Sequence, residues 1–474
     1  MMNPKEIKNF HLIAVCGTGM ASLAGLLKAA GHRVAGSDAN IYPPMSTLLE
    51  DLNIEVKPGY RAENITDAID IAVVGNAVSK TNEEVVAVQE KGIEALSFPA
   101  TLSRYFLEGK RPLVVAGTHG KTTTTSLLAW TLHHAGRDPG FMVGGWLKNF
   151  DTNHRYGAGD FFVVEGDEYD SAYFDKGPKF LHYRPHAAIL TGIEFDHADI
   201  YNNLDEIKDA FRKFTGIIDP AGFLLTAHGD ANIADVIAAT PCDIETYGFS
   251  PDADWTIADY QWQSGSGRFR LLHRGKEAGE FSLPMTGRQN ALNAAAVAAL
   301  CLRLGLTADE VARAYRAFKG IKRRQEVVGT AGGITVIDDF AHHPTAIGLT
   351  LAGIREAWPE GRIWAVFEPR SATSRRNVFQ DSLPESFGAA DGVILAELFA
   401  PEKIPEDQRL NPESLIDRIR STGKNAWYLP KVDAIVEHLA THCRAGDVVL
   451  VMSSGGFGGI HQKLLEKFKD RETP

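Results

Sequence analysis

The sequence has few cysteines and no long apolar run. Its four cysteines lie far apart and form no CxxC pair, so neither a disulfide framework nor a thiolate zinc site is expected, and a reducing cytoplasm fits. No apolar stretch approaches the roughly 20 residues that span a bilayer. The stretch from Met1 to Phe10 has no apolar core after its lysines, so we expect no signal peptide. The sequence predicts a cytoplasmic protein without a membrane partner.

Basic residues are also in deficit. Asp and Glu number 60 against 49 Lys and Arg, for a net charge of −11. A general nucleic-acid binder needs a basic excess for its phosphate contacts, so we expect no nucleic-acid partner, although a local basic pocket for a phosphorylated ligand remains open. The hydrophobic share of 44% is ordinary for a globular protein. A length of 474 residues suggests about three domains.

Three stretches of the chain alternate short apolar strands with helices, which is typical of parallel βαβ units. Strands are predicted at residues 11–15, 33–36 and 71–74, at 112–116, 161–164 and 187–190, and at 332–337, 363–367, 392–395 and 448–452. Residues 255–283 alternate between polar and apolar with glycine turns and predict an antiparallel insertion, and the alanine-rich residues 291–304 predict a core helix. We predict an α/β protein with domains at 1–107, 108–323 and 324–474.

A glycine-rich segment follows the strand predicted at 112–116. It reads Gly117-Thr118-His119-Gly120-Lys121-Thr122. Backbone N–H groups of such a turn cradle phosphate oxygens at a helix N-terminus, Lys121 can reach the β- and γ-phosphates, and the Thr122 hydroxyl can bind Mg²⁺. Val115 occupies the place of the first glycine in the common GxxxxGK[ST] spacing. A turn that only connects strand and helix is the alternative, but strand, glycine, lysine and threonine in register favour a nucleoside triphosphate site.

Acidic residues follow two further predicted strands. Glu165, Asp167, Glu168 and Asp170 come after one strand, and Glu194-Phe195-Asp196-His197 comes after the next. A carboxylate at such a strand end can hold Mg²⁺ against phosphates, whereas a solvated acidic loop and a structural histidine are the alternatives. Because ligands of open α/β sheets bind at the carboxyl edge, three strand ends meeting there favour a metal–phosphate site.

The first unit carries a partial dinucleotide fingerprint. Gly17-Thr18-Gly19 follows its first strand, Asp38 follows the second, and Ser22 stands where the third glycine would be. The residues alone leave NAD binding, binding of another nucleotide and close packing equally open.

Three other groups of residues have polar side chains that suit a nucleotide. Asn290 and Asn293 can cap the alanine-rich helix or bond a purine base. Arg323 and Arg324 can be a solvated linker or can neutralise phosphate charge. The segment from Asp338 to Pro344 has two aspartates and two histidines, which suit either a metal or a ribose.

Taken in order, these segments resemble the Mur ligase family over essentially the whole chain. The resemblance rests on Gly17–Met20, Gly117–Thr123, Glu194–His197, Asn290 with Asn293, Arg323-Arg324 and Asp339–Pro344. It implies the three-domain Mur ligase architecture: a Rossmann-like N-terminal domain for a UDP-sugar, a P-loop-type central ATPase domain, and a Rossmann-like C-terminal domain for the amino component.

The resemblance also implies roles for individual residues. The UDP-sugar would be bound by Gly17, Thr18, Gly19, Met20 and Asp38, and ATP by Gly117, Thr118, His119, Gly120, Lys121, Thr122, Thr123, Asn290, Asn293, Arg324 and Asp339. Mg²⁺ would be held by Thr122, Glu165 and His197, and the catalytic residues would be Lys121, His197 and Glu165. Gln289 and Gly192 depart from the family's usual histidine and asparagine. Arg212 stands where several members carry a carbamylated lysine, so that role is not transferred to Lys213.

Two activities of the family compete. One joins L-alanine to UDP-N-acetylmuramate in peptidoglycan synthesis, and the other attaches the recycled tripeptide L-alanyl-γ-D-glutamyl-meso-diaminopimelate to the same acceptor. The sequence resembles the second at residues 167–176, 195–200, 367–371 and 454–463, where the alanine ligases usually have Glu-Ser-Asp, His-Met-Asp and Gln-Pro-His-Arg. We therefore expect an ATP- and Mg²⁺-dependent ligase of peptidoglycan recycling that acts through an acyl phosphate, as a monomer or weak homo-oligomer. A regulator that kept the fold and lost the chemistry is the alternative from another class.

Overall fold

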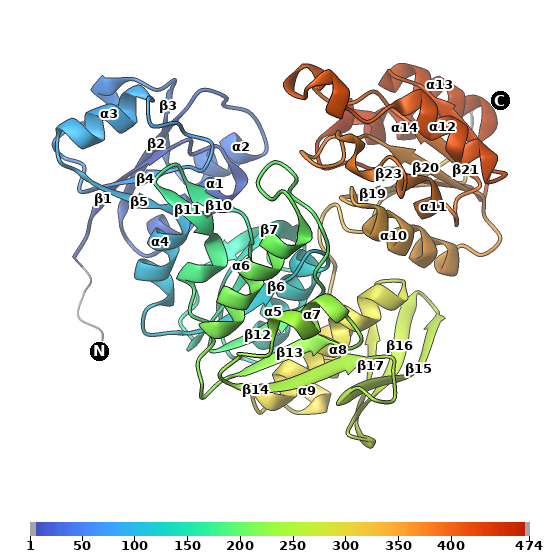
Figure 1. Ribbon diagram of the computed structural model, residues 1–474, viewed down its shortest axis with the longest axis horizontal. Helices are drawn as coiled ribbons and strands as arrows, with labels where there is room; N and C mark the ends of the chain where they lie inside the picture. Colours follow the sequence, from blue (N-terminus) through green and yellow to red (C-terminus); the bar gives the residue numbers. More distant parts are fainter. Residues whose placement is uncertain (1–5, 470–474) are drawn as a thin grey trace.

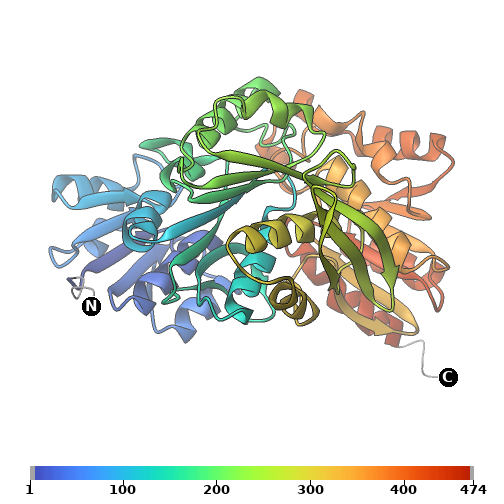
Figure 2. The same ribbon diagram turned by 90° about the horizontal axis from the view of Figure 1, so that it is seen from below.

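The computed structural model of this chain describes residues 6–469 and consists of three α/β units (Figure 1). In Figure 1 the N-terminal unit lies at the upper left, the C-terminal unit at the upper right, and the central unit below and between them. Figure 2 shows the same order from below. Residues 1–5, part of the stretch expected to lack a signal-peptide core, lie outside the described residues. Within residues 6–469, no helix has the length and apolar character required to cross a bilayer.

The N-terminal unit is a parallel sheet of five strands. The strand order is β3 (Glu55–Pro58), β2 (Arg33–Asp38), β1 (Asn9–Ile13), β4 (Ile71–Val74) and β5 (Glu94–Ser97). Its helices are α1 (Thr18–Ala29), α2 (Met45–Asp51), α3 (Glu83–Glu90) and α4 (Phe98–Leu102). The central strands β1 and β4 are almost wholly buried because helices cover both faces of the sheet.

The central unit is built on a sheet of ten strands. The strand order is β17 (Lys276–Leu283), β16 (Ser266–His273), β15 (Trp255–Gln263), β14 (Asp243–Gly248), β13 (Phe223–Ala227), β12 (Ala187–Leu190), β6 (Arg111–Ala116), β9 (Phe161–Gly166), β7 (Gly140–Leu147) and β8 (Thr152–Arg155). The strands β15, β16 and β17 are antiparallel, as predicted for residues 255–283. A separate hairpin pairs β10 (Asp170–Ala172) with β11 (Asp175–Pro178).

The helices of the central unit are α5 (Lys121–His134), α6 (Leu204–Gly216), α7 (Ala231–Val236), α8 (Arg288–Arg303) and α9 (Ala308–Arg316). Helix α8 is the predicted alanine-rich core helix. Its small side chains let it pack closely against α5, and both helices contribute to one core on the same side of the sheet.

The C-terminal unit has six strands, five of them parallel. The order is β18 (Glu326–Ala331), β19 (Ile334–Asp339), β23 (Val448–Met452), β20 (Ile363–Phe367), β21 (Gly392–Leu395) and β22 (Asn425–Tyr428). Its helices are α10 (Pro344–Ala357), α11 (Leu383–Ser386), α12 (Pro412–Ser421), α13 (Val432–His442) and α14 (Ile460–Lys469).

One predicted boundary in this unit was wrong. The strand expected to open at Gly332 begins at Ile334, because Gly332 and Gly333 have positive φ angles of 56° and 69° and form the turn from β18 to β19.

The N-terminal and central units share a hydrophobic core, whereas the C-terminal unit has its own. Residues of β1 and α1 cluster with residues of β6, β9 and β12 in a single buried group. Ser22, in the place of the third fingerprint glycine, donates a hydrogen bond to Asn153 of β8 at 2.9 Å. The cores of the C-terminal unit contain only residues beyond 330 among the buried side chains described. The first two units are therefore joined by apolar packing, and the third is attached mainly by polar contacts.

Candidate active site

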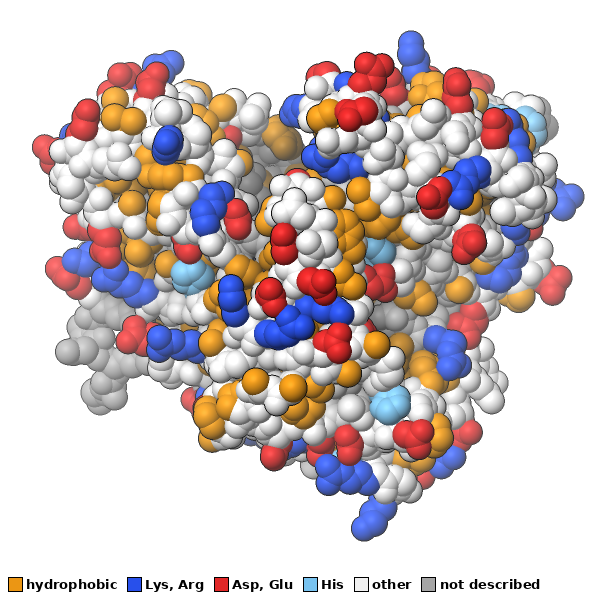
Figure 3. Space-filling model, viewed as in Figure 1, with side chains coloured by type: hydrophobic (Ala, Val, Ile, Leu, Met, Phe, Trp, Pro, Cys, Tyr) orange, Lys and Arg blue, Asp and Glu red, His pale blue; other side chains and the backbone are white. Residues whose placement is uncertain are grey.

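The carboxyl ends of the central strands face one cavity of about 1030 Å³. The space-filling view shows a notch between the two upper lobes, above the central unit (Figure 3). The predicted site residues that line the cavity are Thr18, Gly19, Thr118, His119, Gly120, Lys121, Thr122, Thr123, Glu165, His197, Asn290, Asn293, Arg324 and Asp339. Residues that lie far apart in the sequence thus surround a single space large enough for substrates.

Two glycines shape the phosphate loop between β6 and α5. Gly117 and Gly120 have backbone φ angles of +125° and +82°. Residues other than glycine adopt such angles only with strain. A Cβ atom on Gly117 would also lie 2.3 Å from the hydroxyl oxygen of Thr191. The loop therefore turns tightly into α5, whose N-terminal N–H groups lie at the cavity.

Lys121, the first residue of α5, is held in place by three oxygens. Its Nζ donates to the Gly117 carbonyl at 2.6 Å and to the two carboxylate oxygens of Glu168 at 2.9 and 3.2 Å. Burial alone would lower the pKa of Lys121, but the carboxylates of Glu168 and Asp167 raise it above its ordinary value. The side chain remains a cation.

Glu168 joins Lys121 to His197. Its side chain is only 3% exposed, and its Oε1 atom lies 3.3 Å from His197 Nε2. Burial raises the pKa of Glu168, but Lys121 and His197 together bring it down to about 2. The sequence singled out Glu168 only as one of four acidic residues, because nothing local distinguishes it from its neighbours.

Thr122 and Glu165 form a second polar group. The Thr122 hydroxyl donates to Glu165 Oε2 at 3.2 Å and accepts a hydrogen bond from Arg324 Nη2 at 3.1 Å. The Gly144 N–H donates to Glu165 Oε1 at 2.6 Å. Burial and the nearby Asp167 raise the pKa of Glu165, while Arg324 and Lys121 oppose that rise. A divalent cation would stabilise the charge of this half-buried carboxylate. A hydroxyl beside a carboxylate is an oxygen set that suits Mg²⁺.

The His197 imidazole lines the same cavity, but it contacts the Glu168 carboxylate and the Tyr169 ring rather than Thr122 or Glu165. The structure therefore fits Mg²⁺ at Thr122 and Glu165 through their oxygens. The His197 imidazole instead contacts Glu168, the carboxylate that also holds Lys121.

A third polar group carries the predicted ATP contacts beyond the loop. Asp339 accepts hydrogen bonds from the Ala341 and Gln325 N–H groups, both at 2.8 Å. Asn290 donates to the side-chain oxygen of Gln325 at 3.0 Å. Gln325 thus links Asn290 of the central unit to Asp339 of the C-terminal unit. It was not predicted, because its role depends on how the two units dock.

The predicted UDP-sugar residues divide into two sets. Thr18 and Gly19 line the cavity, whereas Gly17, Met20 and Asp38 do not. Met20 is buried in the core, and Asp38 accepts hydrogen bonds from the Cys16 and Asn40 N–H groups at 2.9 Å. These contacts hold the loops beside the cavity in place, and UDP binding by the five residues stays a prediction.

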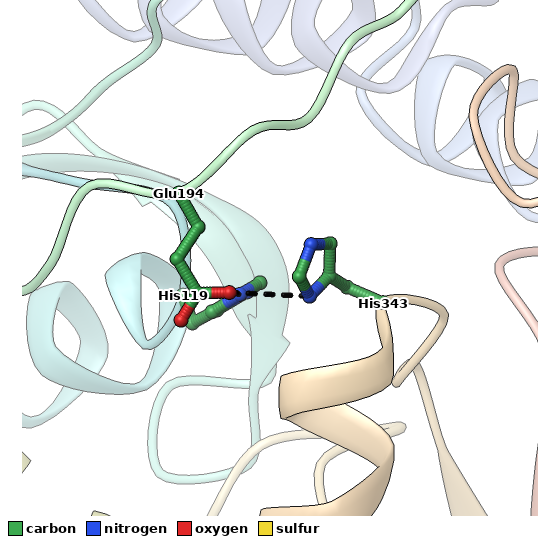
Figure 4. Close-up of side chains that lie close together, drawn as sticks. All are labelled: His119, Glu194 and His343. Carbon is green, nitrogen blue, oxygen red and sulfur yellow. Dashed lines mark hydrogen bonds and ion pairs between the residues drawn. The ribbon is translucent and has the colours of Figure 1, made fainter. Parts of the chain in front are cut away.

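Three side chains meet where the C-terminal unit touches the phosphate loop (Figure 4). Glu194 Oε2 lies 3.4 Å from His119 Nε2 and 3.5 Å from His343 Nδ1, and it accepts a hydrogen bond from the Thr345 hydroxyl at 2.6 Å. Burial raises the pKa of Glu194, but the bonds from His119 and Thr345 lower it to about 2. The sequence placed His119 in the phosphate loop, Glu194 at a strand end that could hold Mg²⁺ and His343 in a segment that suits a metal or a ribose, but it did not bring the three together.

Further polar contacts fasten the C-terminal unit to the loop after β12. The Thr373 hydroxyl donates to Asp196 Oδ1 at 2.7 Å and accepts from the Ala198 N–H at 3.2 Å. His343 Nε2 lies 3.2 Å from the Phe195 carbonyl. Burial raises the pKa of Asp196, but His342, His197 and Thr373 bring it well below its ordinary range.

The neighbouring strands β20 and β23 bring together at the cavity two of the segments that resemble the tripeptide ligases, residues 367–371 and 454–463. Ser371 and Ser454, one from each segment, line it. The Ser453 hydroxyl donates to Glu368, and a Cβ atom on Gly455 would lie 1.9 Å from Arg370 Nε. Arg370 can therefore approach the second segment only because residue 455 is glycine.

Comparison with known proteins gives a family match in each unit. Residues 9–108 match the catalytic domain of the Mur ligase family, residues 115–301 the Mur ligase middle domain, and residues 323–455 the Mur ligase glutamate ligase domain.

Two curated relatives represent the two activities. The chain is 39% identical to the UDP-N-acetylmuramate–L-alanyl-γ-D-glutamyl-meso-2,6-diaminoheptandioate ligase of Escherichia coli K12, over 96% of this chain and 97% of the relative. It is 34% identical to the UDP-N-acetylmuramate–L-alanine ligase of Caldanaerobacter subterraneus, over 98% of this chain and 99% of the relative.

Two crystal structures also match over nearly the whole chain. A murein peptide ligase from Psychrobacter arcticus matches with a TM-score of 0.72 and 35% identity, covering 98% of this chain and 99% of that chain. A UDP-N-acetylmuramate–alanine ligase from Thermotoga maritima matches with a TM-score of 0.79 and 25% identity, covering 98% of this chain and all of that chain.

Proposed function

The chain belongs to the Mur ligase family, whose members are ATP-dependent ligases that form amide bonds, and from this premise we propose which substrates it joins. The acceptor is UDP-N-acetylmuramate, and the amine donor is the tripeptide L-alanyl-γ-D-glutamyl-meso-diaminopimelate. The reaction recycles peptidoglycan fragments in the cytoplasm. The UDP-sugar binds to residues 1–107, ATP to 108–323, and the tripeptide to 324–474.

The observation that carries this proposal is the convergence of the two C-terminal segments on the cavity that also contains Lys121. These segments, at residues 367–371 and 454–463, are two of the four that resemble the tripeptide ligases. They lie side by side at the carboxyl ends of β20 and β23, which is where open α/β sheets bind ligands. Whole-chain identity supports the same donor: two tripeptide ligases are 39% and 36% identical to this chain, against 34% and 35% for two alanine ligases.

The proposed reaction needs ATP because a carboxylate oxygen is a poor leaving group. The lactyl carboxylate of the UDP-sugar attacks the γ-phosphate, which gives an acyl phosphate and ADP. The α-amine of the tripeptide then attacks the acyl carbon and releases phosphate. Transfer of this kind depends on positioning and on charge neutralisation.

The chain's own residues supply that positioning. The phosphate-loop N–H groups and Lys121 bind the triphosphate, and Glu168 holds the Lys121 ammonium at the loop. Thr122 and Glu165 would hold Mg²⁺, which would neutralise phosphate charge. Asn290, Asn293, Arg324 and Asp339 would fix the nucleotide between the central and C-terminal units.

L-alanine is the second candidate donor. It is favoured by the TM-score of 0.79 to the Thermotoga maritima alanine ligase, against 0.72 to the Psychrobacter arcticus peptide ligase. We give this less weight, because a whole-chain superposition of three units also changes with the angles between them, whatever amine they bind.

Coupled ADP release across a panel of amine donors tests the proposal. The purified protein is supplied with ATP, Mg²⁺ and UDP-N-acetylmuramate, together with the tripeptide, L-alanine or no amine. We expect faster ADP release with the tripeptide than with L-alanine. The reverse order would make the protein an alanine ligase, and no release with any donor would make it a regulator without the chemistry.

Two lysine variants extend the same assay, one as a test of the phosphate loop and one as its control. Lys121→Ala should lower turnover ~10²-fold or more, the usual scale for losing a contact that stabilises transition-state charge. Lys467→Ala, which removes the exposed ion pair between Lys467 on α14 and Glu437 on α13, should leave turnover unchanged. Near-normal turnover of Lys121→Ala would show that the phosphate loop is misassigned.

A further inference from the structure

His119, Glu194 and His343 come from three separate segments. His119 lies in the phosphate loop, Glu194 follows β12, and His343 precedes the first residue of α10. The imidazole rings of the two histidines lie 4.5 Å apart between their centres, with the Glu194 carboxylate against both (Figure 4). This group shares no member with the Thr122–Glu165 pair proposed for Mg²⁺.

The spacing of the three ligand atoms matches that of ligands on one metal ion. Glu194 Oε2 is 3.4 Å from His119 Nε2 and 3.5 Å from His343 Nδ1, and all three atoms lie within 4.8 Å of one another. Ligand atoms at about 2.0–2.1 Å from a tetrahedral Zn²⁺ are separated from one another by roughly 3.3–3.4 Å.

The hydrogen bonds of His343 leave the lone pair on the nitrogen that faces Glu194. A carbonyl oxygen only accepts, so His343 Nε2 must carry the proton that it donates to Phe195 O at 3.2 Å. His343 Nδ1 accepts a hydrogen bond of 3.2 Å from the Thr345 N–H, and it faces the Glu194 carboxylate at 3.5 Å. A lone pair and a carboxylate oxygen in contact repel each other unless a cation lies between them. Histidines that bind a metal through one ring nitrogen usually donate a hydrogen bond from the other, often to a backbone carbonyl.

We propose that His119, Glu194 and His343 form a binding site for a divalent transition-metal cation of the zinc class. Two imidazoles and one carboxylate are a donor set typical of zinc, whereas Mg²⁺ prefers oxygen ligands alone. The cation would replace the long Thr345 N–H bond to His343 Nδ1, and the Thr345 hydroxyl would remain bonded to Glu194.

Occupancy of this site would fasten the C-terminal unit to the phosphate loop. Two ligands belong to the central unit and the third belongs to the C-terminal unit, so a bound cation cross-links the units beside Lys121. Because substrates must enter and products must leave between them, such a cation would slow turnover. The site does not depend on which amine donor the enzyme uses.

Titration with Co²⁺ alone tests the proposal on the full-length protein, without nucleotide and with excess Mg²⁺ present. We expect one Co²⁺ per chain, with the visible absorption of a four-coordinate ion, and displacement by Zn²⁺. His343→Asn should weaken binding by at least ~10-fold, since loss of an outer-shell partner already costs that much. Asparagine is a strong helix N-cap, so α10 keeps its cap. Glu194→Gln keeps a hydrogen-bond acceptor for Thr345 and should weaken binding similarly.

A matched control removes a different histidine pair. His438 and His442 stack one turn apart on α13, with ring centres 4.1 Å apart, and could bind Co²⁺ through their imidazoles. His438→Asn should leave the high-affinity site intact. If the binding were lost in His438→Asn, or kept in both His343→Asn and Glu194→Gln, the proposal would be overturned. Absence of saturable Co²⁺ binding to the wild type would overturn it as well.

Discussion

The carboxylate of Glu168 holds two basic side chains of the site at once. It is nearly fully buried and contacts both Lys121 Nζ and His197 Nε2. Removing a buried charge leaves its partner unpaired, which costs more than the pair itself contributes. Glu168 is therefore a positioning residue for Lys121.

We predict that Glu168→Gln lowers the free energy of unfolding by about 3 kcal/mol at pH 7. The pKa of Glu168 is depressed to about 2 from an ordinary 4.5, so its contribution is complete above pH 4.5 and is lost as the pH falls through 2. The difference between wild type and variant, measured by urea unfolding, should shrink below about pH 5. Part of it should also be lost above pH 6.5 as His197, whose pKa burial lowers but Glu168 raises overall, loses its proton. The exposed Glu437→Gln should change stability by less than ~0.5 kcal/mol. A difference that is independent of pH down to pH 2 would contradict the ion pair.

The phosphate loop and α5 act as one element because Gly120 allows a tight turn from the loop into the helix. Gly120 is the N-cap of α5 and has a left-handed backbone. A Cβ atom there would lie 2.8 Å from the side-chain oxygen of Asn293 on α8. Gly120 therefore sets both the start of α5 and the distance between the loop and the proposed adenine contact.

We predict that Gly120→Ala weakens ADP binding by roughly 10-fold and destabilises the fold by about 1–2 kcal/mol, because alanine is strained in this conformation and displaces Asn293. Calorimetric titration with ADP and thermal unfolding measure the two effects. Gly216→Ala is the matched control, since Gly216 ends α6 and a Cβ atom there meets nothing within 4 Å. It should change neither quantity, and ADP affinity equal to wild type in Gly120→Ala would refute the assignment of the loop.

At the scale of the whole molecule, the C-terminal unit is the part best placed to move. Its hydrophobic cores are its own, and the contacts described above attach it through Thr373, His343, Thr345 and Arg324. Polar contacts of this kind contribute about 1 kcal/mol each and can be exchanged for water. The first two units share a core and should behave as one body.

We predict that Thr373→Val loosens this attachment, because valine keeps the shape of the side chain but leaves Asp196 without the Thr373 hydroxyl. Hydrogen exchange should become faster at residues 194–201 and in α10, and kcat/KM should fall about 10-fold, as expected for 1–3 kcal/mol of lost interaction. Thr422→Val, which removes a hydroxyl bond within the end of α12, should change neither measurement. Unchanged exchange in Thr373→Val would show that other contacts hold the units together.

The sequence alone determined the features that depend on neighbours along the chain. Apolar runs such as those of β6, β12, β20 and β23 predict buried parallel strands, because such strands are covered on both faces. The phosphate loop could be predicted because its glycines, lysine and threonine are contiguous. Strands β18 and β22 were missed because they lie at sheet edges and lack a continuous apolar run, as the half-exposed Val327 illustrates.

Only the tertiary structure decided which polar groups meet. Glu168 reaches Lys121 across 47 positions, Gln325 joins Asn290 to Asp339, and His119, Glu194 and His343 span more than 200 residues of the chain. Such contacts depend on the strand order that brings carboxyl ends to one edge and on the docking of the C-terminal unit. Hydrophobic periodicity specifies the strands and helices, but it carries no information about strand order or domain docking. Segments with the same local pattern can occupy different positions in a sheet and can lie on either side of an interface between units.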